Sequence, residues 1–135
     1  IQPYANTRAL FDIADEYKVH YELAEHFYYQ PERIKQALDA LLARHDMIYV
    51  TLDLDVFAQS VAPGVSAPQA LGLQPWQVIP CLQHLARSNK MIAFDVAELN
   101  PTHDRDQQTA RLAAQCIMQV INTSLALTSP TQEGV

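Results

Sequence analysis

The sequence has 135 residues, of which 49% are hydrophobic and 18% charged, so it is long enough to bury the core of one domain. Its net charge of −6, with nine Lys and Arg residues spread along it, argues against a nucleic-acid partner, because such partners are bound by basic side chains. We see no apolar run of about 18 residues and no signal-peptide pattern, so we expect no membrane span and a cytoplasmic location.

The first half of the chain predicts two helices and two strands. NTRALFDIADEY, residues 6–17, is expected to be helical, and VHYELAE, residues 19–25, a short strand. PERIKQALDALLARH, residues 31–45, has apolar residues at the spacing of one helix face and a proline suited to the first turn. MIYVTLDLDVF, residues 47–57, is rich in β-branched and aromatic residues and predicts a strand.

The second half repeats the alternation. After a loop over residues 58–74, we expect a helix over 75–89, a strand over 90–100 and a helix over 104–127 that Asp104 or Asp106 could cap. This order favours an α/β fold with a parallel sheet and helices on both faces. Residues 1–128 are expected to belong to one domain, and residues 129–135 to form a frayed tail.

Two other residues of chemical interest are Cys81 and Cys116, which are far apart in the sequence. Each lies within an apolar helical pattern. We therefore expect both to be core thiols and not a disulfide or a metal pair.

Two carboxylates interrupt the apolar strand at residues 47–57. Strand alternation places Thr51, Asp53 and Asp55 on one face. Burying adjacent carboxylates is costly unless a cation, a hydrogen bond or an ion pair compensates, and hard oxygen ligands suit Mg or Mn. The alternative is that both residues cap loops or pair with Arg. The D-x-D pattern also resembles haloacid-dehalogenase-like phosphatases, but Val56 and its neighbours replace the small hydroxylated residue of that family.

Together with the loop after it, DLDVFAQSVAPGVSAP resembles the second metal-binding signature of the ureohydrolase superfamily, the arginase and agmatinase relatives. DVAELNP, residues 95–101, is similar to the next strand of that family, and QPYANTRALF to an earlier segment. Within the superfamily, APGVSAP, NTRALFD and AELNPTHDRDQQTARLAA resemble the formimidoylglutamases most. The resemblance implies the C-terminal part of an arginase-like three-layer α/β/α fold.

The same resemblance implies a metal-dependent hydrolase of linear amidines that converts N-formimidoyl-L-glutamate and water to L-glutamate and formamide in histidine degradation. Asp53 would bridge two Mn²⁺ ions and Asp55 would bind one of them, with metal-bridging hydroxide as the nucleophile. Glu98 would bind the formimidoyl group, and Arg8, with Asn6 beside it, the substrate carboxylates. Strict strand alternation would put Glu98 and Asp95 on opposite faces unless the strand ends or bulges between them.

One departure from the family pattern is that its first metal signatures, which supply the histidine and most of the carboxylate ligands, do not occur in the sequence. We therefore expect the chain to be the C-terminal half of such an enzyme and inactive alone. An agmatinase or another amidinohydrolase, and a non-catalytic α/β cation-binding module, stay open as alternatives. A homo-oligomer of the full-length enzyme is expected from the resemblance.

Overall fold

The structure, a computed structural model, describes residues 1–128; the predicted tail, residues 129–135, lies outside the described residues. Its elements alternate as the sequence predicts after the first thirty residues. In chain order they are a 3-10 helix η1 (Pro3–Ala5), α1 (Arg8–Glu16), α2 (Ala24–Tyr29), α3 (Pro31–Arg44), β1 (Ile48–Asp53), η2 (Leu54–Val56), α4 (Pro75–Arg87), β2 (Met91–Ala97), η3 (Arg105–Gln107) and α5 (Gln108–Thr128).

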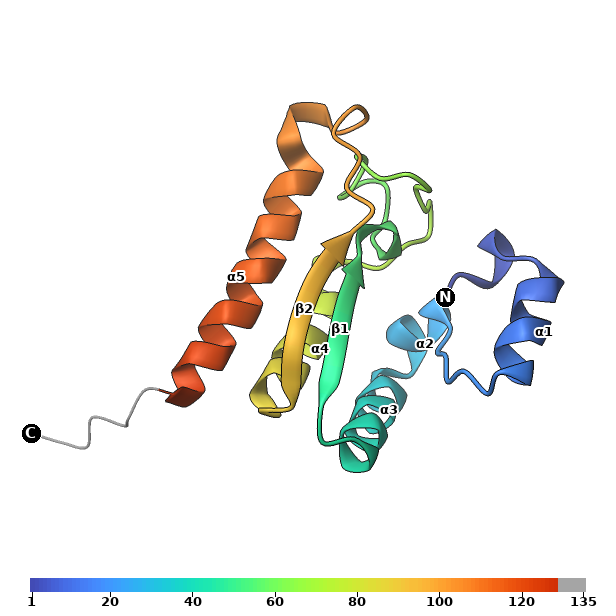
Figure 1. The fold of residues 1–135 in the computed structure, drawn as a ribbon. Coiled ribbons are helices and arrows are strands. Elements are labelled where there is room, and N and C mark those ends of the chain that lie inside the picture. Colours follow the sequence, from blue (N-terminus) through green and yellow to red (C-terminus); the bar gives the residue numbers. More distant parts are fainter. Residues whose placement is uncertain (129–135) are drawn as a thin grey trace, which may run out of the picture.

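The sheet consists of two parallel strands that lie side by side (Figure 1). In their register Thr51 is paired with Asp95 and Asp53 with Ala97. Helix α4 connects the two strands and lies behind them in Figure 1, with α5 packed against it. This β–α–β unit is the connection that parallel strands require, and it brings the carboxyl ends of both strands to one edge.

The two faces of the sheet differ in burial. Ile48 and Leu52 on one face of β1 are buried in the core, whereas Tyr49 on the other face is 60% exposed. The core continues into α4 through Val78 and Leu82 and into α5 through Cys116. The predicted α/β fold with a parallel sheet is confirmed, and within residues 1–128 the face that carries Tyr49, Thr51 and Asp53 is the exposed one. None of the described helices is long and apolar enough to cross a membrane.

The prediction of a strand over residues 19–25 was wrong. This segment has no partner strand among the described residues, and α2 begins within it at Ala24. The Leu23 amide donates to Nδ1 of His26 at 3.3 Å, and the same nitrogen lies 2.5 Å from Oε2 of Glu22. These contacts satisfy a free backbone amide at the start of α2. The alternation of polar and apolar residues in this segment gives no sign of them.

The predicted cap of the last helix is confirmed, but α5 begins at Gln108 and not at residue 104, because Asp106 and Gln107 have a left-handed backbone. Both carboxylate oxygens of Asp104 accept backbone hydrogen bonds, from the amides of Thr109 at 2.8 Å and Ala110 at 2.9 Å, in the first turn of α5. Burial alone would raise the pKa of Asp104, but these bonds outweigh it and hold the pKa below its usual range. Cys81 and Cys116 are free thiols; Cys116 lies in the core as predicted, whereas Cys81 is only half-buried.

The loop between η2 and α4 is tied to the core at both ends. Leu54 and Phe57 are fully buried, and the chain returns beside them, so that the Leu73 amide donates to the carbonyl of Val56 and the Ala58 amide to that of Leu73. Because these bonds close the loop on itself, the segment that follows β1 has a defined path past the end of the sheet.

Candidate metal and substrate site

The carboxylates of Asp53 and Asp55 lie where β1 ends. Asp53 is the last residue of the strand, and Asp55 lies in the short helix η2, so the alternation argument that placed both on one strand face was wrong for Asp55. The reason is a local cap: the Asp55 amide donates to Oδ1 of Asp53 at 2.8 Å and turns the chain out of the strand. The capping part of the alternative reading is therefore observed, while no described Arg or Lys pairs with either residue.

Glu98 reaches the same place from the end of β2. The strand ends at Ala97, and Glu98 has a φ of 68°, in the left-handed region. This conformation breaks the strand alternation, as the sequence interpretation required. Glu98 accepts a hydrogen bond from the Ser66 hydroxyl, whose oxygen is 2.5 Å from Oε2, and the same hydroxyl lies 3.4 Å from Oδ2 of Asp55. Asp95, in contrast, accepts from the hydroxyl of Tyr49 on the exposed face.

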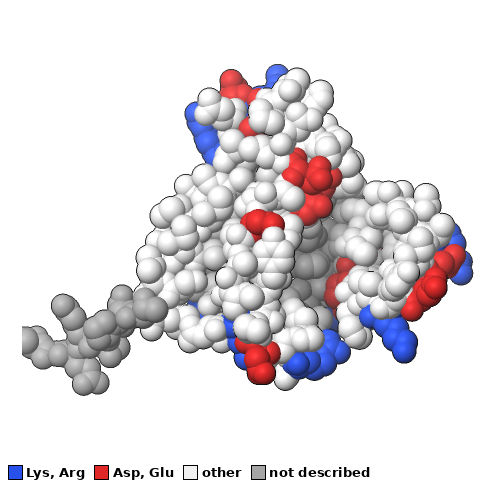
Figure 2. All heavy atoms as spheres, in the orientation of Figure 1, with Lys and Arg blue, Asp and Glu red and all other residues white. Residues whose placement is uncertain are grey.

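The three carboxylates form an acidic site without a compensating cation in the part of the chain that the structure describes. Burial raises the pKa of the Asp53 carboxyl; the amide of Asp55 lowers it, and the negative charges of Asp55 and Glu98 raise it again, with a net increase. Figure 2 shows acidic side chains beside a hollow on this face, while Lys and Arg lie toward the rim of the molecule in this view. The electrostatics therefore favour a bound cation here.

The donor set fits a hard divalent metal but is incomplete. Carboxylate oxygens are the ligands that Mg²⁺ and Mn²⁺ prefer, and Asp53 and Asp55 offer them at one strand end. Among residues 1–128, however, no three His, Cys, Asp or Glu side chains converge in a way that could hold a metal ion. The two aspartates could thus supply part of a coordination sphere, and other ligands would have to complete it.

A cavity of about 740 Å³ is lined by Asp53 and Asp55, but not by Glu98. Asn6 lines it too, where its side-chain amide donates to the carbonyl of Gln2 at 2.9 Å, and its substrate-binding role stays a prediction. Arg8 does not line it: its side chain is 91% exposed, and its Nε donates to Oδ1 of Asp12 at 3.1 Å. His20 also lines the cavity, where its Nε2 lies 3.3 Å from Nη1 of Arg44.

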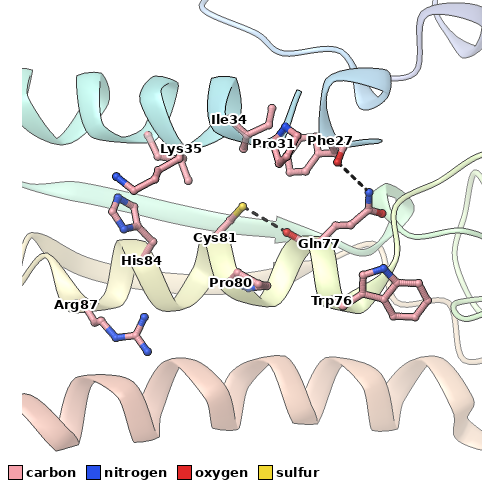
Figure 3. A pocket seen from close by; sticks show the side chains of 11 residues that line it. Phe27, Pro31, Ile34, Lys35, Trp76, Gln77, Pro80, Cys81, His84 and Arg87 are labelled. Atoms are coloured by element: carbon pink, nitrogen blue, oxygen red, sulfur yellow. Dashed lines mark hydrogen bonds between the residues drawn. The ribbon is translucent and has the colours of Figure 1, made fainter. Parts of the chain in front are cut away.

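A second cavity, of about 370 Å³, lies between α2, α3 and α4 and contains none of the predicted site residues (Figure 3). Its wall is mostly apolar. Cys81 donates to the carbonyl of Gln77 within α4, and burial raises the pKa of its thiol. Nε2 of His84 lies 2.7 Å from Oδ1 of Asp39, so this imidazole has a partner within the fold. This cavity is separate from the carboxylate cluster.

Sequence reasoning missed two parts of the site. Ser66 lies in the loop that the resemblance uses, but no spacing pattern marked its hydroxyl as the group between Asp55 and Glu98. The segment over residues 19–22 was assigned to a strand and not to the wall of the larger cavity. A long-range contact of this kind has no signal in a single sequence, because residues 66 and 98 meet only through the fold.

Comparison with known proteins identifies a family for nearly the whole chain. The arginase family matches residues 1–122. Formimidoylglutamase of Legionella pneumophila (strain Paris) is 46% identical over 125 residues, which are 92% of this chain and 39% of that protein. Formimidoylglutamase of Clostridium tetani is 43% identical over 124 residues, or 91% of this chain and 37% of the relative. The chain thus spans less than two fifths of the length of these relatives.

Solved structures agree in fold. The crystal structure of formimidoylglutamase from Bacillus subtilis matches with a TM-score of 0.86 at 24% identity, covering 91% of this chain and 39% of that one. The arginase from Bacillus caldovelox matches with a TM-score of 0.73 at 24% identity, covering 88% of this chain and 39% of that one. At this identity the likeness shows the arginase-like fold alone.

Proposed function

The chain belongs to the arginase family, and we propose that it supplies part of the metal and substrate site of a formimidoylglutamase. The reaction is hydrolysis of N-formimidoyl-L-glutamate to L-glutamate and formamide. The relatives that are 46% and 43% identical are formimidoylglutamases, which supports this substrate over arginine or agmatine. The observation that carries the proposal is that Asp53, Asp55 and Glu98 all lie at the carboxyl ends of two parallel strands, where α/β folds bind their ligands.

Asp53 and Asp55 would hold manganese together with ligands from outside this chain. When bound, the metal pair would supply Lewis-acid stabilisation and activation of water, which are the usual contributions of a two-metal hydrolytic site. The chain itself contributes the two negative charges of Asp53 and Asp55. Because these charges repel each other, a bound cation that offsets them would stabilise the site. The negative charge of Glu98 acts on Asp53, and Ser66 lies between Glu98 and Asp55, which supports a role for Glu98 beside the metal ligands.

Glu98 would accept hydrogen bonds from the cationic formimidoyl group. An amidinium presents N–H donors and a positive charge, and a carboxylate binds both through charge-assisted hydrogen bonds. Oε1 of Glu98 has no hydrogen-bond partner in the described part of the chain, so it is available to a substrate. Asn6 in the cavity wall would contact the substrate as a polar group. Arg8 stays a prediction, since its carboxylate-binding role requires that its side chain leave Asp12.

The test uses the complete polypeptide that contains this segment, supplied with Mn²⁺ and offered N-formimidoyl-L-glutamate, agmatine and arginine separately. We expect glutamate and formamide from the first and no turnover of the others. Asp53→Asn should abolish hydrolysis and weaken manganese binding at least tenfold, while Glu98→Gln should retain the metal and raise KM. Asp46→Asn, at an exposed residue with no side-chain partner in residues 1–128, is the matched control and should change neither.

Two other results would redirect the proposal. Turnover of agmatine or arginine alone would assign the site to another amidinohydrolase. No turnover of any amidine would leave a non-catalytic cation-binding module. A cytoplasmic location and a homo-oligomer of the complete protein also belong to the proposal, and a size measurement in solution tests the second.

A further inference from the structure

Ser66 lies directly opposite Glu98 because two chain segments run antiparallel at this point. Val65 and Leu99 form an antiparallel bridge, and the Asn100 amide donates to the carbonyl of Gly64 at 2.8 Å. In such a pair the residue after Val65 faces the residue before Leu99. The contact between Ser66 and Glu98 is therefore a consequence of backbone pairing and not of a chance side-chain approach.

The loop that carries Ser66 is held against the start of α5 by contacts of Gly64. The Gly64 amide donates to Oγ1 of Thr109 at 2.8 Å, and Thr109 is fully buried at the start of α5. A Cβ atom at Gly64 would lie 2.3 Å from Cβ of Asp104, so the loop is in close contact with the residue that caps α5. Thr109 is buried and Asp104 caps α5, so these contacts hold the backbone of the loop beside Ser66 against the start of that helix.

The Ser66 hydroxyl has one proton, and the distances show where it goes. Its oxygen is 2.5 Å from Oε2 of Glu98 and 3.4 Å from Oδ2 of Asp55, so the donated bond is to Glu98. A separation of 2.5 Å is typical of a hydroxyl that donates to a charged carboxylate. This bond occupies one oxygen of Glu98 and leaves Oε1 without a partner in residues 1–128.

The backbone of Glu98 adds a second constraint. Its φ of 68° is uncommon for a residue with a side chain and unfavourable, so it needs compensation from its surroundings. The Leu99 bridge and the Ser66 hydrogen bond flank this residue on its backbone and on its side chain. A strained backbone beside a fixed carboxylate is typical of a pre-organised binding group.

We propose that Ser66 is a positioning residue for amidinium recognition: its hydroxyl holds Oε2 of Glu98 so that Oε1 faces the amidinium of the substrate. This inference rests on the proposed function, in which Glu98 binds the formimidoyl group. It assigns to Ser66 the orientation of the carboxylate and not a contact with the metal. Loss of the hydroxyl frees the Glu98 side chain to rotate, and the binding site loses its pre-organisation.

The experiment compares Ser66→Ala and Ser66→Thr in the complete, manganese-loaded polypeptide, with Ser60→Ala as the matched control in the same loop. Ser60 is exposed, and its side chain has no hydrogen-bond partner in the described residues. KM and kcat for N-formimidoyl-L-glutamate are measured, together with the inhibition constants of guanidinium ion and of L-glutamate. Guanidinium probes the Glu98 end of the site alone, whereas L-glutamate lacks the amidine and probes the remainder.

We expect Ser66→Ala to raise KM and the guanidinium inhibition constant by the same factor, on the order of tenfold to a hundredfold, as for a lost hydrogen bond to a charged group. The L-glutamate inhibition constant and the manganese content should not change. Ser66→Thr keeps the hydroxyl at an exposed position and should restore both constants to within about threefold, a small fraction of one such bond. Ser60→Ala should behave as wild type.

The inference is overturned if Ser66→Ala binds guanidinium as wild type does, or if the guanidinium and L-glutamate constants rise together, which indicates general damage to the site. A wild-type protein that hydrolyses no amidine overturns the proposed function and with it the role of Ser66. Active wild type with an unaffected Ser66→Ala variant overturns the role of Ser66 alone, so the two failures are distinguishable.

Discussion

The hydroxyl of Thr109 supports the site loop from the core, and its removal gives the sharpest stability prediction. Thr109 is fully buried, and its Oγ1 accepts from the amide of Gly64 at 2.8 Å. Thr109→Val preserves the shape of the side chain but leaves the buried Gly64 amide without an acceptor. An unsatisfied buried amide costs about 1–3 kcal/mol, and the upper part of this range is expected because the hydroxyl also interacts with the Asp104 carboxylate.

The assay is urea denaturation of the complete polypeptide, combined with amide hydrogen exchange at Gly64. Thr123→Val, a half-buried threonine of the same helix with no hydrogen bond from its side chain in residues 1–128, is the matched control and should change stability by less than about 0.5 kcal/mol. Thr109→Val should also speed exchange of the Gly64 amide. Equal stability of the two valine variants, with unchanged exchange, would refute the reasoning that this hydroxyl anchors the loop.

Three further predictions concern the site and its support. Asp104→Ala should destabilise the protein by about 1 kcal/mol through loss of the α5 cap, with Asp46→Ala as the control. Because the pKa of Asp104 is lowered on folding, its contribution is present above the usual carboxyl pKa and is lost as the pH falls through the lower folded value; denaturation across acidic pH measures this. Gly64→Ala should destabilise by about 1–3 kcal/mol in the same assay, because its Cβ would lie 2.3 Å from Asp104. Asp53→Asn should leave the metal-free protein as stable or more stable, since the raised pKa of Asp53 marks an unfavourable charge, while manganese affinity, measured by calorimetry, falls at least tenfold.

Each of these has an outcome that contradicts it. A difference between Asp104→Ala and wild type that persists unchanged in strong acid would show that the carboxylate charge is not what supports α5. Wild-type stability of Gly64→Ala would mean that the loop accommodates the added Cβ atom without a loss of folding free energy. For Asp53→Asn, a marked loss of metal-free stability would indicate that the carboxylate has a structural role in place of a metal-binding one.

The regular part of the fold was predictable because periodicity and length agree over long segments. The apolar spacing after Pro31 and Pro75 predicted α3 and α4, and the β-branched runs predicted β1 and β2. The parallel arrangement followed from the alternation of helices and strands. These helices and strands bury their apolar faces against each other. The spacing of apolar residues in the sequence therefore indicates which face is buried.

The site was predictable in its carboxylates but not in its geometry. Asp55 left the strand because the Asp53 side chain capped a turn, and a local hydrogen bond of this kind overrides strand alternation. Glu98 reached the site through a left-handed backbone that the sequence does not specify. Ser66 met Glu98 through pairing of distant segments, and Arg8 took a local partner in Asp12. The pairing of distant segments and the choice of a side chain between two partners both depend on the folded structure. Neither can be read from the sequence alone.

Anomalous X-ray scattering from manganese in crystals of the complete polypeptide locates the metal directly. We expect manganese peaks within coordination distance of the carboxylates of Asp53 and Asp55, and the loss of these peaks in Asp53→Asn. Manganese bound elsewhere, or a site beside Asp53 and Asp55 without any metal at saturating manganese, would contradict this expectation.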